Sequence, residues 1–343
     1  MKPLLALLPL LAASALAADQ PTDWSQMKDD SGDYAQSKAI CAKLLDHPTP
    51  SAIDLNLSDT ADLTGCDSEA LYYGIGMAPD PAKARKCALL DVKQGDDSVF
   101  GGRTMLMTVY ANGHGAKRDL DLATHLACQI DGAPAERDGR VRHLAELKAK
   151  GWKGSGFDYC DDITSGLAMG YCEEHAARLA DAARETGFGR VAAGLSPDAR
   201  RALAGLRKSH DAFAEAHSSG ELDLSGTARA AFSIAAEQRL KGEFLDMLQR
   251  LGGGRAPAYS HAQYLADDAR LNAVYRKRLA GIAPDSGPGG VTKEGVRDAQ
   301  RAWIRYRDAF IAFAAVAYPK ASRDSLAAWI TEKRISMLSE AEG

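Results

Sequence analysis

The chain has 343 residues, with 42 lysine and arginine residues against 46 aspartate and glutamate residues, a formal net charge of −4. A nucleic-acid-binding protein usually shows a strong basic excess on one face, so this balance gives no indication of such a partner. Aromatic residues make up only 7% of the chain. Together with many alanines, this composition favours short, closely packed helices, and we expect an all-α protein of two or three domains.

The N-terminus has the pattern of a secretory signal at residues 1–17. Lys2 precedes the apolar run Leu4–Ala12, and Ala15-Leu-Ala17 supplies small residues at a cleavage site. No stretch approaches the roughly 18 apolar residues of a membrane span. No cysteine lies at the cleavage site, so a lipid anchor is not expected. We predict a mature protein that begins near Ala18 and is periplasmic or secreted.

Six cysteines lie in the predicted mature chain, and an even number in an exported protein favours three disulfides. They are Cys41, Cys66, Cys87, Cys128, Cys160 and Cys172. No pair has CxxC spacing and no histidine has zinc-like spacing to them, so we expect no metal and no cofactor. Among the first four, we favour Cys41–Cys66 and Cys87–Cys128. Cys66–Cys87 is the alternative, because these two lie symmetrically about the turn of a predicted helical hairpin.

Residues 18–150 read as a helical-repeat region that begins with one helix at about residues 33–45. Two similar units follow, Glu69–Leu90 and Met105–Cys128, and a period of this size is typical of helical solenoids. Their matching positions, at a constant offset of 39, are Asp80, Ala84 and Ala88 in the first and Asp119, Ala123 and Ala127 in the second. The pattern resembles SEL-type repeats, many of which are protein-binding scaffolds.

The C-terminal region is predicted to contain a helical hairpin. In its second helix, Val296, Trp303 and Phe310 recur on one face of a 3.6-residue period, and Thr292 is a plausible N-cap. In its first helix, Leu271, Tyr275 and Leu279 recur at steps of four. A Gly- and Pro-rich segment separates the two helices.

Residues of this hairpin and a later arginine form a recognisable motif in the region 258–340. It consists of an acid before Leu-Asn-x-x-Tyr, then Ala-Gln-Arg-x-Trp-x-x-x-Arg-Asp, then a late arginine. The positions are Asp268, Leu271, Asn272, Tyr275, Ala299, Gln300, Arg301, Trp303, Arg307, Asp308 and Arg334. The motif resembles the LprI-type lysozyme inhibitor domain, a small bacterial helical domain.

Residues 157–252 resemble a degenerate copy of the same domain. Leu179–Arg184 repeats as Leu265–Arg270, while Leu206 and His210 replace the tryptophan and arginine of the motif. Two cysteines about a dozen residues apart open the family domain, and the resemblance therefore implies a Cys160–Cys172 disulfide. The predicted architecture is a short helical-repeat region followed by two small helical LprI-like domains.

The stripe Gln300, Trp303 and Arg307 has two interpretations. Trp and Arg dominate interface hot spots, so the stripe could face a partner. We favour instead an internal polar clasp, in which Arg307 pairs with Asp267 or Asp268, Asn272 bonds Gln300, and Trp303 fills the core. The partner surface is then expected at the Gly281–Val291 loop, beside the basic residues Arg276, Lys277 and Arg278.

The sequence contains no Gly-x-Ser-x-Gly and no His-Glu-x-x-His motif, so we expect no enzyme. The LprI-like motif implies an exported, non-catalytic binder that inhibits, or gives immunity against, a lysozyme-like cell-wall hydrolase. The partner would be a host muramidase or a rival bacterium's cell-wall-targeting toxin. One alternative is a periplasmic scaffold or envelope assembly factor. A β-lactam-binding enzyme is a second, because some cysteine-rich SEL-type proteins have that activity.

Overall fold

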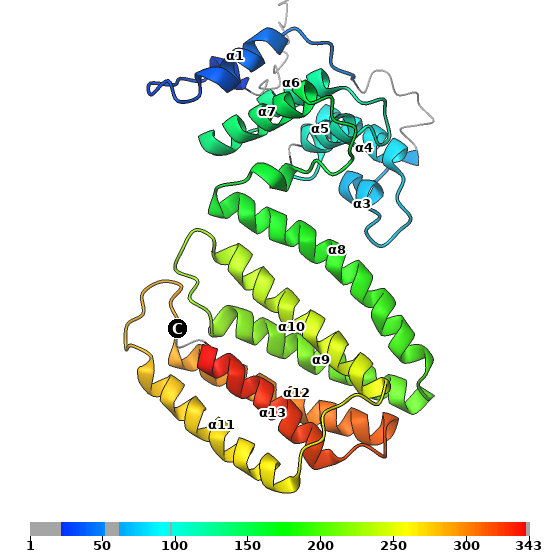
Figure 1. Cartoon of the computed structure of the whole chain (residues 1–343), viewed down its shortest axis with the longest axis vertical. Coiled ribbons are helices and arrows are strands. Elements are labelled where there is room, and N and C mark those ends of the chain that lie inside the picture. Colours follow the sequence, from blue (N-terminus) through cyan, green and yellow to red (C-terminus); the bar gives the residue numbers. More distant parts are fainter. Residues whose placement is uncertain (1–21, 52–61, 97, 341–343) are drawn as a thin grey trace, which may run out of the picture. The chain divides into compact units, whose positions relative to one another are not determined.

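The structure is a computed structural model that describes residues 22–51, 62–96 and 98–340 (Figure 1). Its regular elements are helices, and these residues contain no strand, which confirms the predicted all-α fold. None of the described helices is long and apolar enough to cross a membrane. The predicted signal peptide at residues 1–17 lies outside the described residues.

The chain divides into two compact units that alternate in sequence. The first takes the described residues up to Ser68 together with Ala82–Phe157. The second takes Glu69–Pro81 together with the described residues from Asp158 onward. The assignment of Glu69–Pro81 to the second unit was not foreseen from the sequence, in which this segment opens the first repeat.

Helix α6 is the centre of the first unit, because α5 and α7 pack on it and α1 contacts both α6 and α7. Small residues make this close packing possible: Ala84, Ala88, Ala123 and Ala127 are all fully buried. The elements are η1 (Trp24–Gln26), α1 (Ala35–Leu44), α4 (Pro81–Gln94), α5 (Gly102–Asn112), α6 (Leu120–Gln129) and α7 (Pro134–Ala149).

The two predicted repeats have matching turns. The amide of Asp80 donates to the carbonyl of Leu71 at 2.7 Å, and the amide of Asp119 donates to the carbonyl of Tyr110 at 3.0 Å. The offset is again 39 residues. Gly74 and Gly113 both have a positive φ, 77° and 69°, which favours glycine. This agreement supports a repeat, while its assignment to the SEL type stays a prediction.

Three disulfides link the six cysteines: Cys41–Cys128, Cys66–Cys87 and Cys160–Cys172. The pairing that the LprI resemblance implied is therefore confirmed, and so is the alternative Cys66–Cys87. The favoured pairs Cys41–Cys66 and Cys87–Cys128 were wrong. The reason is that α1 packs against α6, which brings Cys41 to Cys128 across 87 residues of sequence.

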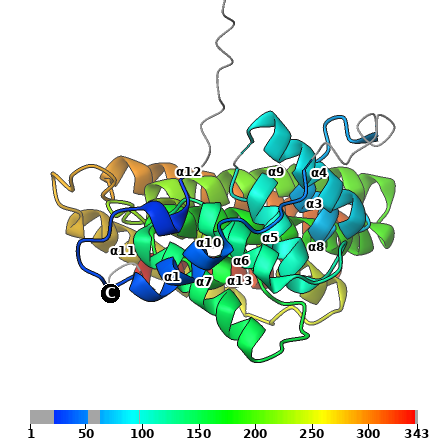
Figure 2. The ribbon, with the colours of Figure 1, turned by 90° about the horizontal axis from the view of Figure 1, so that it is seen from above.

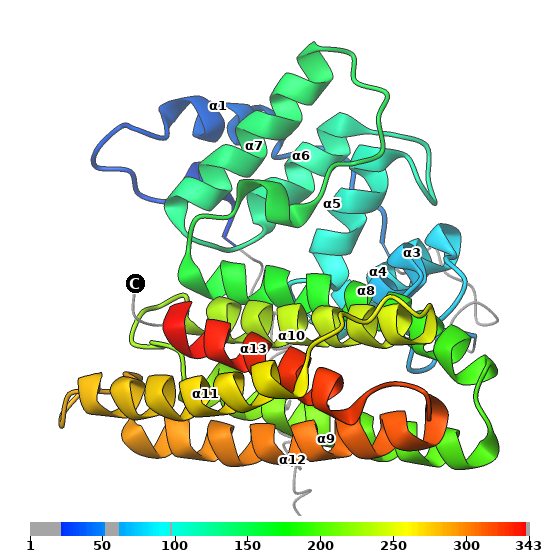
Figure 3. The same cartoon turned by 60° about the horizontal axis from the view of Figure 1, so that its bottom comes forward.

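Six long helices form most of the second unit, and their axes are roughly aligned, with successive helices running in opposite directions (Figures 2 and 3). Helix α8 packs along α10, α11 packs along α13, and α9 pairs with α12. The short α3 is tied to α8 because buried Glu69 accepts a hydrogen bond from His175 at 2.5 Å and pairs with Arg178. The elements are α3 (Ser68–Tyr73), η3 (Tyr159–Asp162), α8 (Gly166–Ala193), α9 (Pro197–Gly220), α10 (Arg229–Gly252), α11 (His261–Gly281), α12 (Lys293–Ala317) and α13 (Arg323–Glu340).

One hydrophobic core runs through these six helices, from Phe188 on α8 to Leu338 on α13. Helices α9 and α12 approach each other tightly at Gly220 and Gly295, where an added Cβ on either glycine would lie within 3 Å of the other residue's backbone. The predicted division between residues 252 and 258 falls in the connection between α10 and α11. The core continues across that connection, so the two predicted domains share it.

Candidate protein-binding site

The predicted apolar stripe of α12 faces the core. Val296, Trp303 and Phe310 are at most 2% exposed. Thr292 is the N-cap, and its hydroxyl accepts a hydrogen bond from the amide of Gly295 at 3.0 Å. Because its indole is buried, Trp303 does not face a partner, which favours the clasp interpretation over the hot-spot interpretation for this residue.

The other contacts of the predicted clasp were wrong. Arg307 pairs with its neighbour Asp308 at 2.9 Å, and its guanidinium lies 5.3 Å from the Trp303 ring. Exposed Asn272 donates to the carbonyl of Asp268 at 2.8 Å on its own helix. The physical reason is the order of the helices, since α11 packs along α13 rather than α12.

Asp267 therefore takes no part in a clasp with Arg307. Two further motif residues of α11 contact the shared core: Leu271 is buried and Tyr275 is half-buried.

The motif arginine that is buried in the second unit is instead Arg334 on α13, which is fully buried. Its two terminal nitrogens donate to both carboxylate oxygens of Glu221, at 2.7 and 2.6 Å. Its Nε donates to Gln300 at 2.9 Å. The His217 ring nitrogen Nδ1 lies 2.7 Å from the same carboxylate. A buried charge requires this pairing, because isolated burial of an ion is very unfavourable.

Burial opposes the ionisation of Glu221, but the hydrogen bonds from Arg334 and His217 outweigh it and hold the pKa of this carboxyl below its usual value. Glu221 was missed from the sequence. It lies just after α9, outside the motif, and no spacing rule connects it with Arg334.

The basic residues predicted for a partner surface lie in the last two turns of α11. Arg276 and Lys277 are exposed, and Arg278 is half-buried. Cationic side chains near a helix C-terminus interact favourably with the helix dipole. Solvent can reach the side chains of Arg276 and Lys277, as a docking surface requires.

The adjoining loop is exposed over residues 283–289 and anchored at both ends. Ile282 is buried at its start. Near its end, the carbonyl of Gly289 accepts a hydrogen bond from the amide of Leu224 at 2.8 Å. A Cβ on Gly289 would lie 2.5 Å from the Leu224 carbonyl, so only glycine fits there. The loop is a restrained protrusion beside the connection between α9 and α10.

One group of possible metal ligands is found among the described residues: Cys66, Cys87 and Asp91, whose ligand atoms lie within 4.8 Å of one another. The two sulfurs are bonded to each other as a disulfide. Thiolates, not disulfide sulfurs, are the ligands that bind metals. This group is therefore not a metal site while the disulfide is present.

Comparison with known proteins gave one family match. Neither the curated proteins nor the solved structures gave a match to the chain. Residues 255–338, which hold α11, α12 and most of α13, match the family model described as lysozyme inhibitor LprI.

Proposed function

We propose that the chain is an exported, non-catalytic protein that binds and inhibits a lysozyme-like cell-wall hydrolase. The observation that carries this proposal is the match of residues 255–338 to lysozyme inhibitor LprI. Three disulfides support export, because such bonds persist in the periplasm and outside the cell. Residues 258–343 hold 13 basic against 10 acidic side chains, unlike the acidic remainder of the chain.

The basic end of α11 and the restrained loop 282–292 suggest how inhibition would work. Lysozyme-like hydrolases use two carboxyl groups in an open cleft, one a general acid with a raised pKa. A protrusion that presents cationic side chains can enter such a cleft and pair with these acids. Arg276 and Lys277 are exposed at the base of the loop and are the residues that we assign to this contact.

The experiment measures peptidoglycan hydrolysis by several unrelated muramidases with the mature protein in micromolar excess. We expect inhibition of at least one enzyme, and loss of inhibition in the double variant Arg276→Glu/Lys277→Glu. Arg270→Glu is the matched control, because Arg270 is exposed on the same helix but lies six residues away. Unchanged hydrolysis for every muramidase would contradict the proposal. Inhibition that persists in the double variant would show that the contact lies on another part of the surface.

A scaffold in the cell envelope is the second candidate, favoured by the matching turns at Gly74 and Gly113. Repeats of this kind commonly bind other proteins along a stacked surface. A pull-down with the mature protein separates the two functions. A muramidase among the captured proteins supports inhibition, and envelope proteins captured without any hydrolase support the scaffold.

A further inference from the structure

A groove of about 710 Å³ lies on the second unit, outside the residues that match the family. Helix α9 provides most of its lining and α10 provides one side chain. The lining residues are Ala204, Arg207, Lys208, Asp211, Ala212, Glu215 and Glu237. Ala204 and Ala212 are two turns apart on one face of α9, and their small side chains leave the space open.

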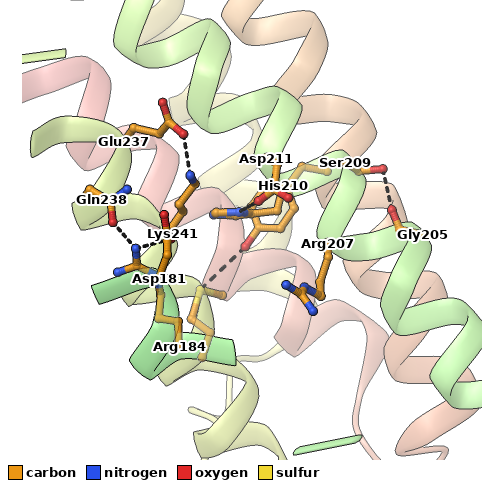
Figure 4. A network of polar contacts seen from close by, with 12 residues as sticks. Asp181, Arg184, Gly205, Arg207, Ser209, His210, Asp211, Glu237, Gln238 and Lys241 are labelled. Carbon is orange, nitrogen blue, oxygen red and sulfur yellow. Dashed lines mark hydrogen bonds and ion pairs between the residues drawn. The ribbon is translucent and has the colours of Figure 1, made fainter. Parts of the chain in front are cut away.

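Ion pairs already neutralise two of the charged lining residues, and Figure 4 shows one of these pairs, Glu237 with Lys241. Glu237 pairs with Lys241 at 2.6 Å one turn along α10. Arg207 pairs with Glu185 and lies 4.0 Å above the ring of Phe188. These pairs hold the side chains that form the walls of the groove. The charges that remain available to a ligand belong to the other lining residues.

Lys208, Asp211 and Glu215 are exposed on the same side of α9. Neither Lys208 nor Glu215 forms an ion pair with a described residue. The Asp211 carboxylate lies 3.4 Å from Nδ1 of His210, and this contact orients it. His210 is itself 2% exposed and its ring is stacked 4.2 Å from that of Phe244. The groove therefore has a cationic end and an anionic end.

We propose that this groove binds a short extended peptide segment of a partner protein, with a basic side chain at Asp211 and Glu215 and an acidic side chain at Lys208. Charge complementarity selects this occupant. Lys208 and Glu215 are seven residues apart, about 10 Å along a helix that rises about 1.5 Å per residue. An extended peptide covers about the same distance in three residues. The groove is thus a second binding surface, independent of the proposed inhibitory loop.

The test uses the mature chain and an acetylated, amidated Arg-Gly-Gly-Glu peptide, observed by amide NMR. We expect chemical-shift changes in residues 204–215 that saturate at millimolar peptide. Replacing the peptide's arginine by citrulline, or its glutamate by glutamine, keeps the shape and removes one charge. Each replacement should weaken binding about two- to fivefold, the range of exposed ion pairs. Binding should also weaken as NaCl rises from about 50 to about 300 mM.

Variants of the protein provide the reciprocal test. Lys208→Gln and Glu215→Gln should weaken binding of the parent peptide to the same extent as the matching peptide replacements. Asp246→Asn is the control, because Asp246 is exposed on α10 outside the groove. Equal binding of the citrulline peptide, or equal binding by both variants, would overturn the proposal. Muramidase inhibition measured on the same variants is expected to be unchanged, which separates this site from the inhibitory loop.

Discussion

Arg334 and Glu221 are 113 residues apart in sequence and form a buried ion pair with two hydrogen bonds, at 2.7 and 2.6 Å. Arg334 belongs to the segment that matches lysozyme inhibitor LprI, whereas Glu221 lies outside it. Among the described residues from 255 to 338, Arg334 is the one fully buried arginine, and its acidic partner comes from the residue that directly follows α9.

Glu221→Ala should lower the free energy of unfolding by about 3–5 kcal/mol, because it leaves the Arg334 guanidinium buried without its acid. The double variant Glu221→Gln/Arg334→Met removes both charges and should recover much of the loss. Urea denaturation measures each value. A change for Glu221→Ala no larger than that of Asp298→Ala, which breaks an exposed pair with Arg301, would show that the pair is not buried in solution.

The same carboxyl gives a pH dependence. The pKa of Glu221 is lower in the folded protein than its ordinary value of 4.5. Its contribution to stability is therefore complete above about pH 4.5 and is lost as the pH falls through the lower folded value. Urea melts between pH 7 and pH 3 should show a steeper acid-induced loss for the wild type than for Glu221→Gln. Parallel curves of unfolding free energy against pH for the two proteins would contradict the lowered pKa of Glu221.

Trp303→Ala should cost about 3–5 kcal/mol, as is usual when a large aromatic side chain is removed from a core. The neighbouring Ile304 is 39% exposed and lies on the outer side of α12. Ile304→Ala is therefore the control, with an expected change below about 1 kcal/mol. Thermal or urea unfolding of both variants gives the comparison, and similar small losses for the two would place the tryptophan at the surface.

Gly295→Ala should destabilise the second unit, because the new Cβ would lie 2.5 Å from the carbonyl oxygen of Gly220. Rigid backbone on both sides prevents easy relaxation, and overpacking typically costs about 1–3 kcal/mol. Gly205→Ala on α9 is the matched control, since nothing lies within 4 Å of its added Cβ. In a helix interior this change should stabilise by about 0.5–1 kcal/mol. Opposite signs in urea melts are the expected result.

Peptide mapping without reduction should recover Cys41–Cys128, Cys66–Cys87 and Cys160–Cys172. Replacing both cysteines of Cys41–Cys128 by serine should cost about 4.5 kcal/mol, against about 3 kcal/mol for Cys160–Cys172. The difference follows from the loops that they close, with sequence separations of 87 and 12. Six free thiols in periplasmic material would contradict both the pairing and the proposed export.

The sequence by itself determined the helical class, the buried face of α12, the Thr292 cap and the presence of an LprI-like segment. The buried face and the cap depend on residues within one or two helical turns of one another, and the LprI-like motif depends on residue types at fixed positions in the chain, so no tertiary contact is needed to find them. The repeat turns at Gly74 and Gly113 belong to the same group, because each turn is stabilised by hydrogen bonds within about ten residues.

Only the tertiary structure decided what each buried face contacts. Periodicity shows that a side chain is buried, but it does not show which helix covers it. For this reason the sequence placed Arg307 against the acids of α11, whereas α11 packs on α13 and the fully buried arginine of residues 255–338 is Arg334. The packing of α1 on α6 likewise selected Cys128 as the partner of Cys41, since disulfide partners are fixed by the spatial order of helices rather than by their order in the chain.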